Sequence, residues 1–354
     1  MSTDTKPASE YGVPVAFPRP RKTDWKIGFI GFGGIAQNHL AAYRAAGWSV
    51  VAIADPSESA RERATQQGIP RVYADYREML VDPAIDVVVL LTQPNLRVEP
   101  IEHALRAGKP VLTEKPLAAT WDEAVQVAEL SAKYRLPVAV SQNYRWIATP
   151  FAVRHLIEQN WIGKPFFGQI ELYGTQDIDL REHGFYSKCE DFLTLQWNNH
   201  LADLLRCWFG AEPQRVQAIT RRRAGQHFVS GNLLLSTIDY GPGLTGHIVH
   251  SELLCAGMPS NHCRIDGDNG SLVFPLWGNS IQLTSKRLAD GPVSLVVDGP
   301  DFAHTQIGTL GDLLCAIEDK REPLLSARNN LATLSHVFAE HASTLSEGQW
   351  VSCK

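Results

Sequence analysis

Cysteine is scarce in this sequence, and no two cysteines have the spacing of a metal site. Six occur among 354 residues, none of them in the first half of the chain, and no pair forms a Cys-x-x-Cys motif. This argues against both a zinc site and a disulfide framework, so we expect no bound metal. Isolated thiols suit a reducing compartment, and we therefore expect a cytoplasmic protein.

Long hydrophobic runs are also missing. No stretch approaches the length of a membrane-spanning helix, which argues against a membrane protein. Residues 1–23 are polar, contain four prolines and lack the apolar core of a signal peptide. We interpret them as a flexible or wrapping N-terminal arm.

Positive charge is not in excess either. The formal net charge is −5, and the one basic cluster is Arg221-Arg222-Arg223. Because binding to a phosphate backbone requires a basic surface, we do not expect nucleic acid as a partner. A hydrophobic content of 44% is typical of a globular protein, and 354 residues suit two domains rather than one.

Residues 24–146 alternate short apolar runs with helical patterns, which predicts a Rossmann domain. Runs of Val, Ile and Leu without polar alternation are typical of strands in a parallel sheet that is covered on both faces. Their alternation with helices predicts a doubly wound α/β fold. The expected strands are 26–31, 49–54, 87–91, 111–112 and 138–140, and the expected helices are 35–46, 57–67, 76–80, 96–107 and 121–134.

Residues 147–354 have a different pattern and form the second predicted domain. We expect an α+β domain with a large, mostly antiparallel, open-faced sheet, which serves substrate binding and oligomerisation. The closing helices are free to pack back on the first domain. The expected helices are 151–158, 192–209, 306–318 and 329–340, and the expected strands are 166–173, 215–222, 233–240, 245–254, 263–266, 271–274, 280–283 and 293–297.

The strongest local motif follows the first expected strand. Gly31, Gly33 and Ala36 match the G-x-G-x-x-G/A fingerprint, with an apolar strand before it and an Ala-rich helix after it. The glycines permit a tight turn and let a pyrophosphate approach the backbone, while the start of the helix supplies N–H donors. We therefore predict a dinucleotide site. The residues of its turn are Gly31, Phe32, Gly33, Gly34 and Ile35.

Asp55 ends the second expected strand, where the ribose of a dinucleotide would lie. A carboxylate at this position accepts hydrogen bonds from the ribose hydroxyls and repels a 2′-phosphate. We therefore predict NAD as the cofactor in preference to NADP. Arg61, one helical turn further on, would weaken this preference.

Glu114-Lys115-Pro116 follows the strand expected at 111–112, and with this motif the sequence resembles the glucose–fructose oxidoreductase/inositol dehydrogenase/MocA family. Further matches are Thr92-Gln93-Pro94-Asn95 and Ile265-Asp266-Gly267-Asp268-Asn269-Gly270. The resemblance implies an oxidoreductase that transfers a hydride between a nicotinamide and a secondary alcohol or ketone of a sugar, cyclitol or sugar derivative. It also implies a homodimer or homotetramer. The cofactor contacts that it adds are Thr92, Asn95, Glu114, Lys115 and Arg145.

Lys115 is the first candidate catalytic residue. A lysine at the carboxyl end of a parallel strand points into the crevice in which α/β sheets bind ligands. Its ammonium can donate a hydrogen bond to a substrate hydroxyl and stabilise the alkoxide that develops as hydride departs. Glu114 would lie beside the nicotinamide ribose, and the resemblance implies a cis bond between Lys115 and Pro116.

The resemblance places the second catalytic residue at His200. The family commonly has Asp-x-x-x-His here, followed by another Asp; His200 and Asp203 match, whereas Gln196 replaces the first Asp. On one continuous helix, positions 196, 200 and 203 share a face. His200 is then the candidate general base. Gln196 orients its ring without stabilising the charged form, unless Asp203 takes that role.

Softer candidates complete the predicted site. Tyr144 and Arg145 follow the last expected strand of the first domain, His183 lies in a polar loop, and Trp197 precedes His200 by three residues. Aromatic walls with polar neighbours suit a carbohydrate or polyol ring, but ordinary packing explains these side chains equally well. The predicted substrate contacts are Lys115, Tyr144, His183, Trp197 and His200.

Two further histidines, His247 and His250, do not add a metal pair. They lie three residues apart on an expected strand, so they face opposite sides of the sheet.

Two other functions remain open at this point. Some relatives break glycosidic bonds through transient oxidation by bound NAD, and others bind a dinucleotide only as a sensor or transcriptional co-regulator. Stoichiometric release of NADH would distinguish a dehydrogenase from the first class. Retention of Lys115 and His200 argues against the second class.

Overall fold

The computed structural model describes residues 5–14, 16–299 and 302–354, and the chain divides into two compact units. We call them the six-stranded and the ten-stranded unit after their sheets. The six-stranded unit comprises Phe17–Trp146 and Pro300–Leu331, and the ten-stranded unit comprises Met1–Ala16, Ile147–Gly299 and Ala332–Lys354. Within the described ranges, no helix combines the length and the apolar character that crossing a membrane requires.

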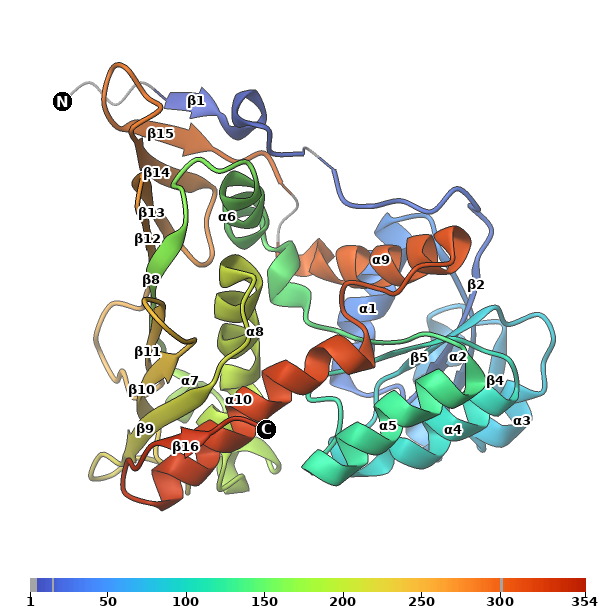
Figure 1. Ribbon diagram of the computed structural model, residues 1–354. Helices are drawn as coiled ribbons and strands as arrows, with labels where there is room; N and C mark the ends of the chain where they lie inside the picture. The colour runs from blue at the N-terminus through green and yellow to red at the C-terminus, as the bar shows by residue number, and fades with distance from the viewer. Residues whose placement is uncertain (1–4, 15, 300–301) are drawn as a thin grey trace. The chain divides into compact units, whose positions relative to one another are not determined.

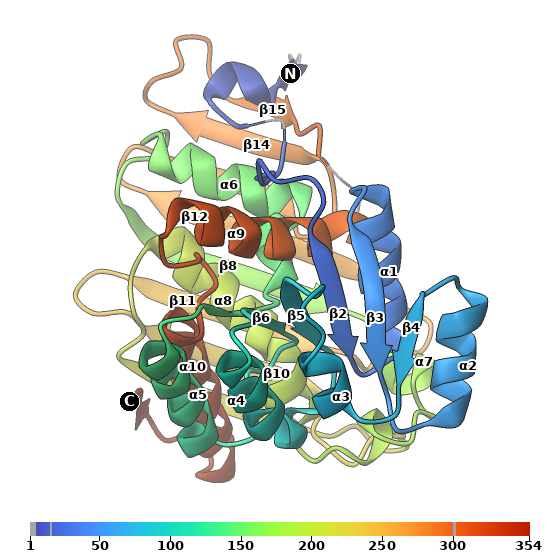
Figure 2. The same cartoon turned by 90° about the vertical axis from the view of Figure 1, so that its right-hand side faces the viewer.

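The six-stranded unit is built on a parallel sheet with the strand order β4-β3-β2-β5-β6-β7, which confirms the doubly wound fold. Figure 2 shows β2, β3 and β4 running in one direction. The strands are β2 (Lys26–Ile30), β3 (Ser49–Ala54), β4 (Arg71–Tyr73), β5 (Val87–Leu90), β6 (Val111–Thr113) and β7 (Val138–Val140). The helices are α1 (Gly34–Ala45), α2 (Glu58–Gln66), α3 (Tyr76–Leu80), α4 (Val98–Arg106), α5 (Trp121–Tyr134) and α9 (Thr305–Asp319), with short turns η2 (Pro94–Leu96), η3 (Asn143–Trp146) and η6 (Phe302–His304).

Helices bury both faces of this sheet, which explains its unbroken apolar strands. All four residues of β5 are buried, as are the three of β6 and of β7. α1 packs against α9, and α4 packs against α5 (Figure 1). β4 was not predicted, because its three residues lie at the edge of the sheet and are not buried.

The ten-stranded unit has the strand order β1-β15-β14-β13-β12-β8-β11-β10-β9-β16. Its pairings are antiparallel except for β1 with β15 and β8 with β11, so the predicted mostly antiparallel sheet is confirmed. The strands are β1 (Thr5–Pro7), β8 (Pro165–Tyr173), β9 (Arg215–Arg221), β10 (Leu233–Asp239), β11 (Thr245–Ser251), β12 (Ser260–Gly267), β13 (Gly270–Pro275), β14 (Ser280–Ser285), β15 (Val293–Val296) and β16 (Val351–Ser352). The helical segments are η1 (Ala8–Tyr11), α6 (Ala148–Glu158), α7 (Gln176–Asp179), η4 (Tyr186–Lys188), η5 (Phe192–Trp197), α8 (Asn198–Phe209) and α10 (Ala327–Leu345).

The segment predicted as an N-terminal arm contributes to both units. β1 adds a parallel strand to the edge of the ten-stranded sheet, and the Trp161 indole donates a hydrogen bond of 2.9 Å to the carbonyl of Tyr11. Further along, the Arg21 backbone N–H donates to the Glu318 carboxylate at the end of α9, in the six-stranded unit. Residues 1–4 and 15 lie outside the described residues.

The prediction of one continuous α-helix over residues 192–209 is wrong. Phe192–Trp197 form the π-helix η5, and the α-helix α8 begins only at Asn198. A π-helical turn bonds residue i to i+5 rather than i+4, so it rotates the preceding side chains relative to the α-helix that follows. The argument that Gln196 and His200 share a helical face therefore does not hold. An apolar period continues through such a junction and does not reveal it.

α6 and α8 lie on the same face of the ten-stranded sheet (Figure 1), and β8 approaches α8 closely at Gly168. A Cβ atom on Gly168 would lie 2.6 Å from Cζ of Phe209 and 3.3 Å from a methyl carbon of Leu205. Both are side chains of α8, so a residue larger than glycine would displace the Phe209 ring or the helix that carries it.

Gly168→Ala should therefore destabilise the protein by about 1–3 kcal/mol, the usual cost of overpacking a core. Gly184→Ala is the matched control, because a Cβ there has no heavy atom within 4 Å. Urea unfolding followed by tryptophan fluorescence measures both variants. Equal unfolding midpoints for Gly168→Ala and Gly184→Ala would contradict the packing argument.

Candidate functional site

The glycine turn lies where the strand order of the six-stranded sheet reverses, between the carboxyl ends of β2 and β5. Ligands of open α/β sheets bind at such a point. Gly31 has φ +91°, and a Cβ there would lie 3.1 Å from the carbonyl oxygen of Leu91. Both the backbone conformation and the close approach require glycine, as the fingerprint predicted.

The next two glycines leave space in front of helix α1. A Cβ on Gly33 or Gly34 would meet no heavy atom within 4 Å. Gly33 is the N-cap of α1, and no side chain caps the N–H groups of the first turn. Ile35 in this turn is 38% exposed, whereas the Phe32 side chain is fully buried. An open, uncapped helix start of this kind fits the pyrophosphate of a dinucleotide.

Asp55 is tied to this turn. One carboxylate oxygen accepts a hydrogen bond of 2.7 Å from the Phe32 N–H, and the other accepts one of 2.8 Å from the Ser57 N–H. The Arg61 guanidinium donates to the backbone carbonyls of Asp55 and Pro56, at 2.9 and 2.8 Å. The structure thus fixes a carboxylate at the end of β3, beside the glycine turn.

Glu114, at the end of β6, is held by a buried chain of hydrogen bonds. His39 Nε2 of α1 donates to its carboxylate over 2.8 Å, and Nδ1 of the same ring lies 2.9 Å from the Tyr43 hydroxyl oxygen. Burial opposes ionisation of Glu114, but the hydrogen bond and charge of His39, together with Lys115 and Arg97, hold its pKa below its usual range. His39 was not predicted, because its partner lies 75 residues away.

Arg97 is a second functional residue that the sequence analysis missed. Its side chain is buried, and it donates two hydrogen bonds to the carbonyl of Thr92, at 3.1 and 2.7 Å, and others to the carbonyls of Glu114 and Pro116. Burial lowers the pKa of Arg97 to about 10 against the opposing effect of Glu114. The one available signal was its position two residues after the Thr92–Asn95 match.

The charges of Glu114 and Arg97 both act on Lys115. Burial lowers the pKa of its ammonium to about 8, Glu114 opposes this shift, and Arg97 adds to it. Its backbone N–H donates to the Glu114 carboxylate over 3.1 Å, and the Lys115–Pro116 bond is cis, as expected. A cation with a lowered pKa is a stronger proton donor than an ordinary lysine, which suits a group that bonds a developing alkoxide.

The remaining predicted cofactor residues differ in their surroundings. The hydroxyl oxygen of Thr92 is buried and has no hydrogen-bond partner among the described residues, whereas Asn95 is exposed. Tyr144 and Arg145 belong to η3, which the Asn143 amide fastens to Thr305 of α9 over 2.9 Å. The Tyr144 ring is buried and packs edge-on against Phe302, with ring centroids 5.8 Å apart.

In the ten-stranded unit, the structure brings Trp197 and His200 together. Their rings pack edge to face with centroids 6.3 Å apart, and Trp277 lies 6.2 Å from Trp197. His200 is buried, while Trp197 and Trp277 are partly exposed. The indole N–H of Trp197 donates to the Gln176 side chain over 2.6 Å. The two partly exposed indoles can pack against a sugar ring, and the imidazole of His200 beside Trp197 can accept a proton from it.

Asp203 and His183 have other contacts. The Asp203 carboxylate accepts a hydrogen bond of 2.8 Å from Thr333 of α10, and the neighbouring Asn198 donates to Glu340 of the same helix over 2.6 Å. His183 is exposed and stacks on Tyr186, with ring centroids 4.5 Å apart. Gln196 is partly exposed in the π-helix η5.

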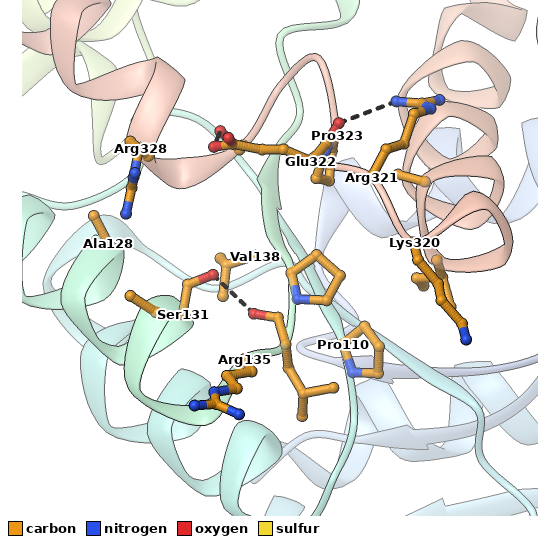
Figure 3. Close-up of a pocket in the computed structure, with 16 residues that line it drawn as sticks. Pro110, Ala128, Ser131, Arg135, Val138, Lys320, Arg321, Glu322, Pro323 and Arg328 are labelled. Carbon is orange, nitrogen blue, oxygen red and sulfur yellow. Dashed lines mark hydrogen bonds between the residues drawn. The ribbon is translucent and has the colours of Figure 1, made fainter.

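A hollow of about 490 Å³ lies at the end of the six-stranded sheet opposite the glycine turn (Figure 3). Pro110 and Pro137, which line it, directly precede β6 and β7, so it adjoins the amino ends of these strands. Arg135 and Lys320, also in its lining, occupy the C-caps of α5 and α9, where cations complement the helix dipoles. We therefore assign these charges to helix ends and the candidate site to the opposite, carboxyl edge.

Two family models match the chain: the oxidoreductase family with the NAD-binding Rossmann fold over residues 25–142, and the GFO/IDH/MocA C-terminal domain over residues 152–273. A 1,5-anhydro-D-fructose reductase of Ensifer adhaerens is 32% identical to this chain, and the match covers 87% of this chain and 92% of the reductase. The chain belongs to the glucose–fructose oxidoreductase/inositol dehydrogenase/MocA family. It is an NAD-binding oxidoreductase of this family.

Two further comparisons agree with this family assignment. A D-apiose dehydrogenase of Paraburkholderia graminis is 25% identical over 93% of this chain and 90% of that protein. A crystallised levoglucosan dehydrogenase, in complex with NADH and levoglucosan, shares the family fold with a TM-score of 0.82. It is 20% identical, and the match covers 93% of this chain and 99% of that one.

The charges around Lys115 generate a test with opposite outcomes. Glu114→Gln should lower the pKa of Lys115 further, since it removes a carboxylate, and Arg97→Gln should raise it, since it removes a cation. The pH dependence of Lys115 modification by an amine-selective reagent, followed by mass spectrometry, measures both shifts. Arg97→Lys keeps the charge and is the control, with Lys188 as the internal standard for the reagent. Shifts in the same direction would refute this electrostatic account.

Proposed function

We propose that this protein is an NAD-dependent dehydrogenase that oxidises a secondary alcohol of a sugar, cyclitol or sugar derivative, or reduces the matching ketone. The observation that carries the proposal is Lys115, an ammonium with a pKa near 8 at the carboxyl end of β6, on the edge that bears the glycine turn. The relatives support the substrate class, because an apiose dehydrogenase and an anhydrofructose reductase both act on sugars.

The residues at the carboxyl edge of the six-stranded sheet fit NAD. Bound NAD would supply the acceptor for the hydride that leaves the alcohol carbon. The open turn would hold its pyrophosphate, Asp55 its adenine ribose, and Glu114 its nicotinamide ribose. The buried hydroxyl of Thr92, which lacks a partner among the described residues, supports this fit. Asn95, Arg145 and the turn residues Gly31, Phe32, Gly33, Gly34 and Ile35 complete the proposed contacts.

Lys115 and His200 would divide the work on the substrate hydroxyl. Lys115 donates a hydrogen bond to the hydroxyl oxygen and stabilises the negative charge that develops there. His200 accepts the hydroxyl proton on its imidazole. Gln196 carries no charge, so it does not stabilise the imidazolium as the family's usual carboxylate would. Trp197 would pack against the sugar ring, with Tyr144 and His183 as further contacts.

Compartment and assembly belong to the same proposal. All six cysteines are free thiols, which suits the reducing cytoplasm. A homodimer or homotetramer follows from the family resemblance and calls for a measurement of the mass in solution.

A panel of sugars, cyclitols and sugar acids incubated with NAD⁺ tests the proposal through the absorbance of NADH. The expected result is formation of NADH in amounts equal to the alcohol oxidised. Turnover of a glycoside without net NADH would indicate transient oxidation instead, and NAD binding without turnover of any compound in either direction would refute the dehydrogenase.

Asp55 predicts the cofactor preference. NAD should bind more tightly than NADP, because the carboxylate repels a 2′-phosphate, and Asp55→Asn should narrow the ratio of the two dissociation constants by about tenfold or more. Glu58→Gln is the control, since it removes an exposed carboxylate three residues away. Calorimetric titration with both dinucleotides measures the ratio. Equal affinities in the unchanged protein would remove Asp55 from the site.

A variant series tests the catalytic assignment. Lys115→Met should leave NAD binding nearly intact and lower turnover by about 100-fold or more, as loss of an oxyanion donor does. His200→Ala should abolish most turnover, and Gln196→Ala should cost less. Gln196→Asp tests whether the π-helix η5 still brings position 196 to His200. A carboxylate in contact with the imidazole would move the acidic limb of the pH profile of kcat/KM to higher pH, because it favours the charged, non-basic form, whereas an unchanged limb would show that the two side chains do not meet. An acidic limb that is unchanged in His200→Ala would assign the base to another group.

A further inference from the structure

His250 and Glu252 form a buried pair, and the histidine of this pair packs against Trp197. The Glu252 carboxylate accepts a hydrogen bond of 2.8 Å from His250 Nε2. His250 is 0% exposed and Glu252 is 2% exposed. The His250 ring packs edge-on against the Trp197 indole, with centroids 5.2 Å apart. His247, on the same strand, is partly exposed and has its Nδ1 3.4 Å from the Thr237 hydroxyl instead.

Glu252 is also linked to Trp197 through Gln176. Its other carboxylate oxygen accepts a hydrogen bond of 3.1 Å from the backbone N–H of Gln176, whose side chain holds the Trp197 indole N–H over 2.6 Å. Gly174 makes room for this carboxylate, since a Cβ there would lie 2.2 Å from a Glu252 oxygen. One buried carboxylate therefore bonds two of the residues that contact the indole, the ring of His250 and the backbone of Gln176.

We propose that the His250–Glu252 pair is a positioning device that sets the orientation of Trp197, and through it the binding of the sugar ring. The second half of this inference rests on the proposed function. A buried carboxylate that bonds two partners has little freedom to move, so it transmits a fixed position to both. Trp197 needs such support because it is partly exposed and because an indole stacks on a ring only in a defined orientation. Neither residue touches the reacting atoms in this proposal.

The first measurement needs no substrate. Subtracting the emission spectrum of Trp197→Phe from that of the parent isolates the Trp197 signal. The same subtraction is then made in the His250→Asn and Glu252→Gln backgrounds. Both changes should alter the emission maximum or the intensity of the Trp197 signal. His250→Asn removes the ring that packs on the indole, and Glu252→Gln removes the carboxylate that holds that ring. His247→Asn, the same substitution on the same strand, should not. An unchanged Trp197 signal in both variants would overturn the proposal.

The second measurement is kinetic. With the sugar that the panel identifies, His250→Asn and Glu252→Gln should each raise KM by about five- to tenfold, with kcat nearly unchanged and NAD affinity intact. In the Trp197→Phe background the same changes should have little further effect, because the residue through which they act is gone. A loss confined to kcat, or additive effects in the double variants, would overturn positioning. A variant that merely misfolds would lose active protein and thermal stability at unchanged KM.

The two arms separate this inference from the proposed function. If no sugar or polyol is turned over, the proposed function fails, and the Trp197 emission by itself decides whether the pair positions the indole. If turnover occurs and the emission does not change, the function stands and the positioning device is refuted.

Discussion

The buried guanidinium of Arg97 joins the two loops on which the candidate site of the six-stranded unit depends. It bonds the carbonyl of Thr92 after β5 and the carbonyls of Glu114 and Pro116 after β6. A buried cation is stable only when acceptors replace its water, so the two loops cannot separate without leaving that charge unpaired. Burial lowers the pKa of Lys115, Glu114 opposes this shift, and the charge of Arg97 adds to it. One side chain therefore holds the backbone on either side of the candidate catalytic lysine and also contributes to its electrostatics.

The parts of the fold that could be predicted are those encoded by neighbouring residues. Continuous apolar runs located β3 and β7 to the residue, and the glycine fingerprint located the turn whose Gly31 adopts a positive φ. The short edge strand β4 has no such run. The π-helix η5 escaped because the apolar pattern does not distinguish a bond to i+5 from one to i+4.

The parts of the site that could not be predicted depend on distant partners. His39 bonds Glu114 across 75 positions and Arg97 bonds Pro116 across 19, so no local pattern shows which partner either residue has. His250 is a different case. It was set aside because it cannot pair with His247, yet Glu252 lies two residues further along on the same side of the chain. Alternate positions near a strand share a face, and that spacing was the available signal.

A buried carboxylate recurs in both units as the group that fixes a functional side chain. Glu114 bonds His39 and the backbone of Lys115, and Glu252 bonds His250 and the backbone of Gln176. Each carboxylate is nearly inaccessible to water and has protein donors in its place. Removing water from a charge is costly, and the cost is recovered only when every bond is made in one geometry. Such a site does not have to reorganise when a substrate arrives, which is the property that electrostatic catalysis and ring stacking both require. The backbone of Lys115 and, in our proposal, the indole of Trp197 are thus positioned during folding rather than during binding.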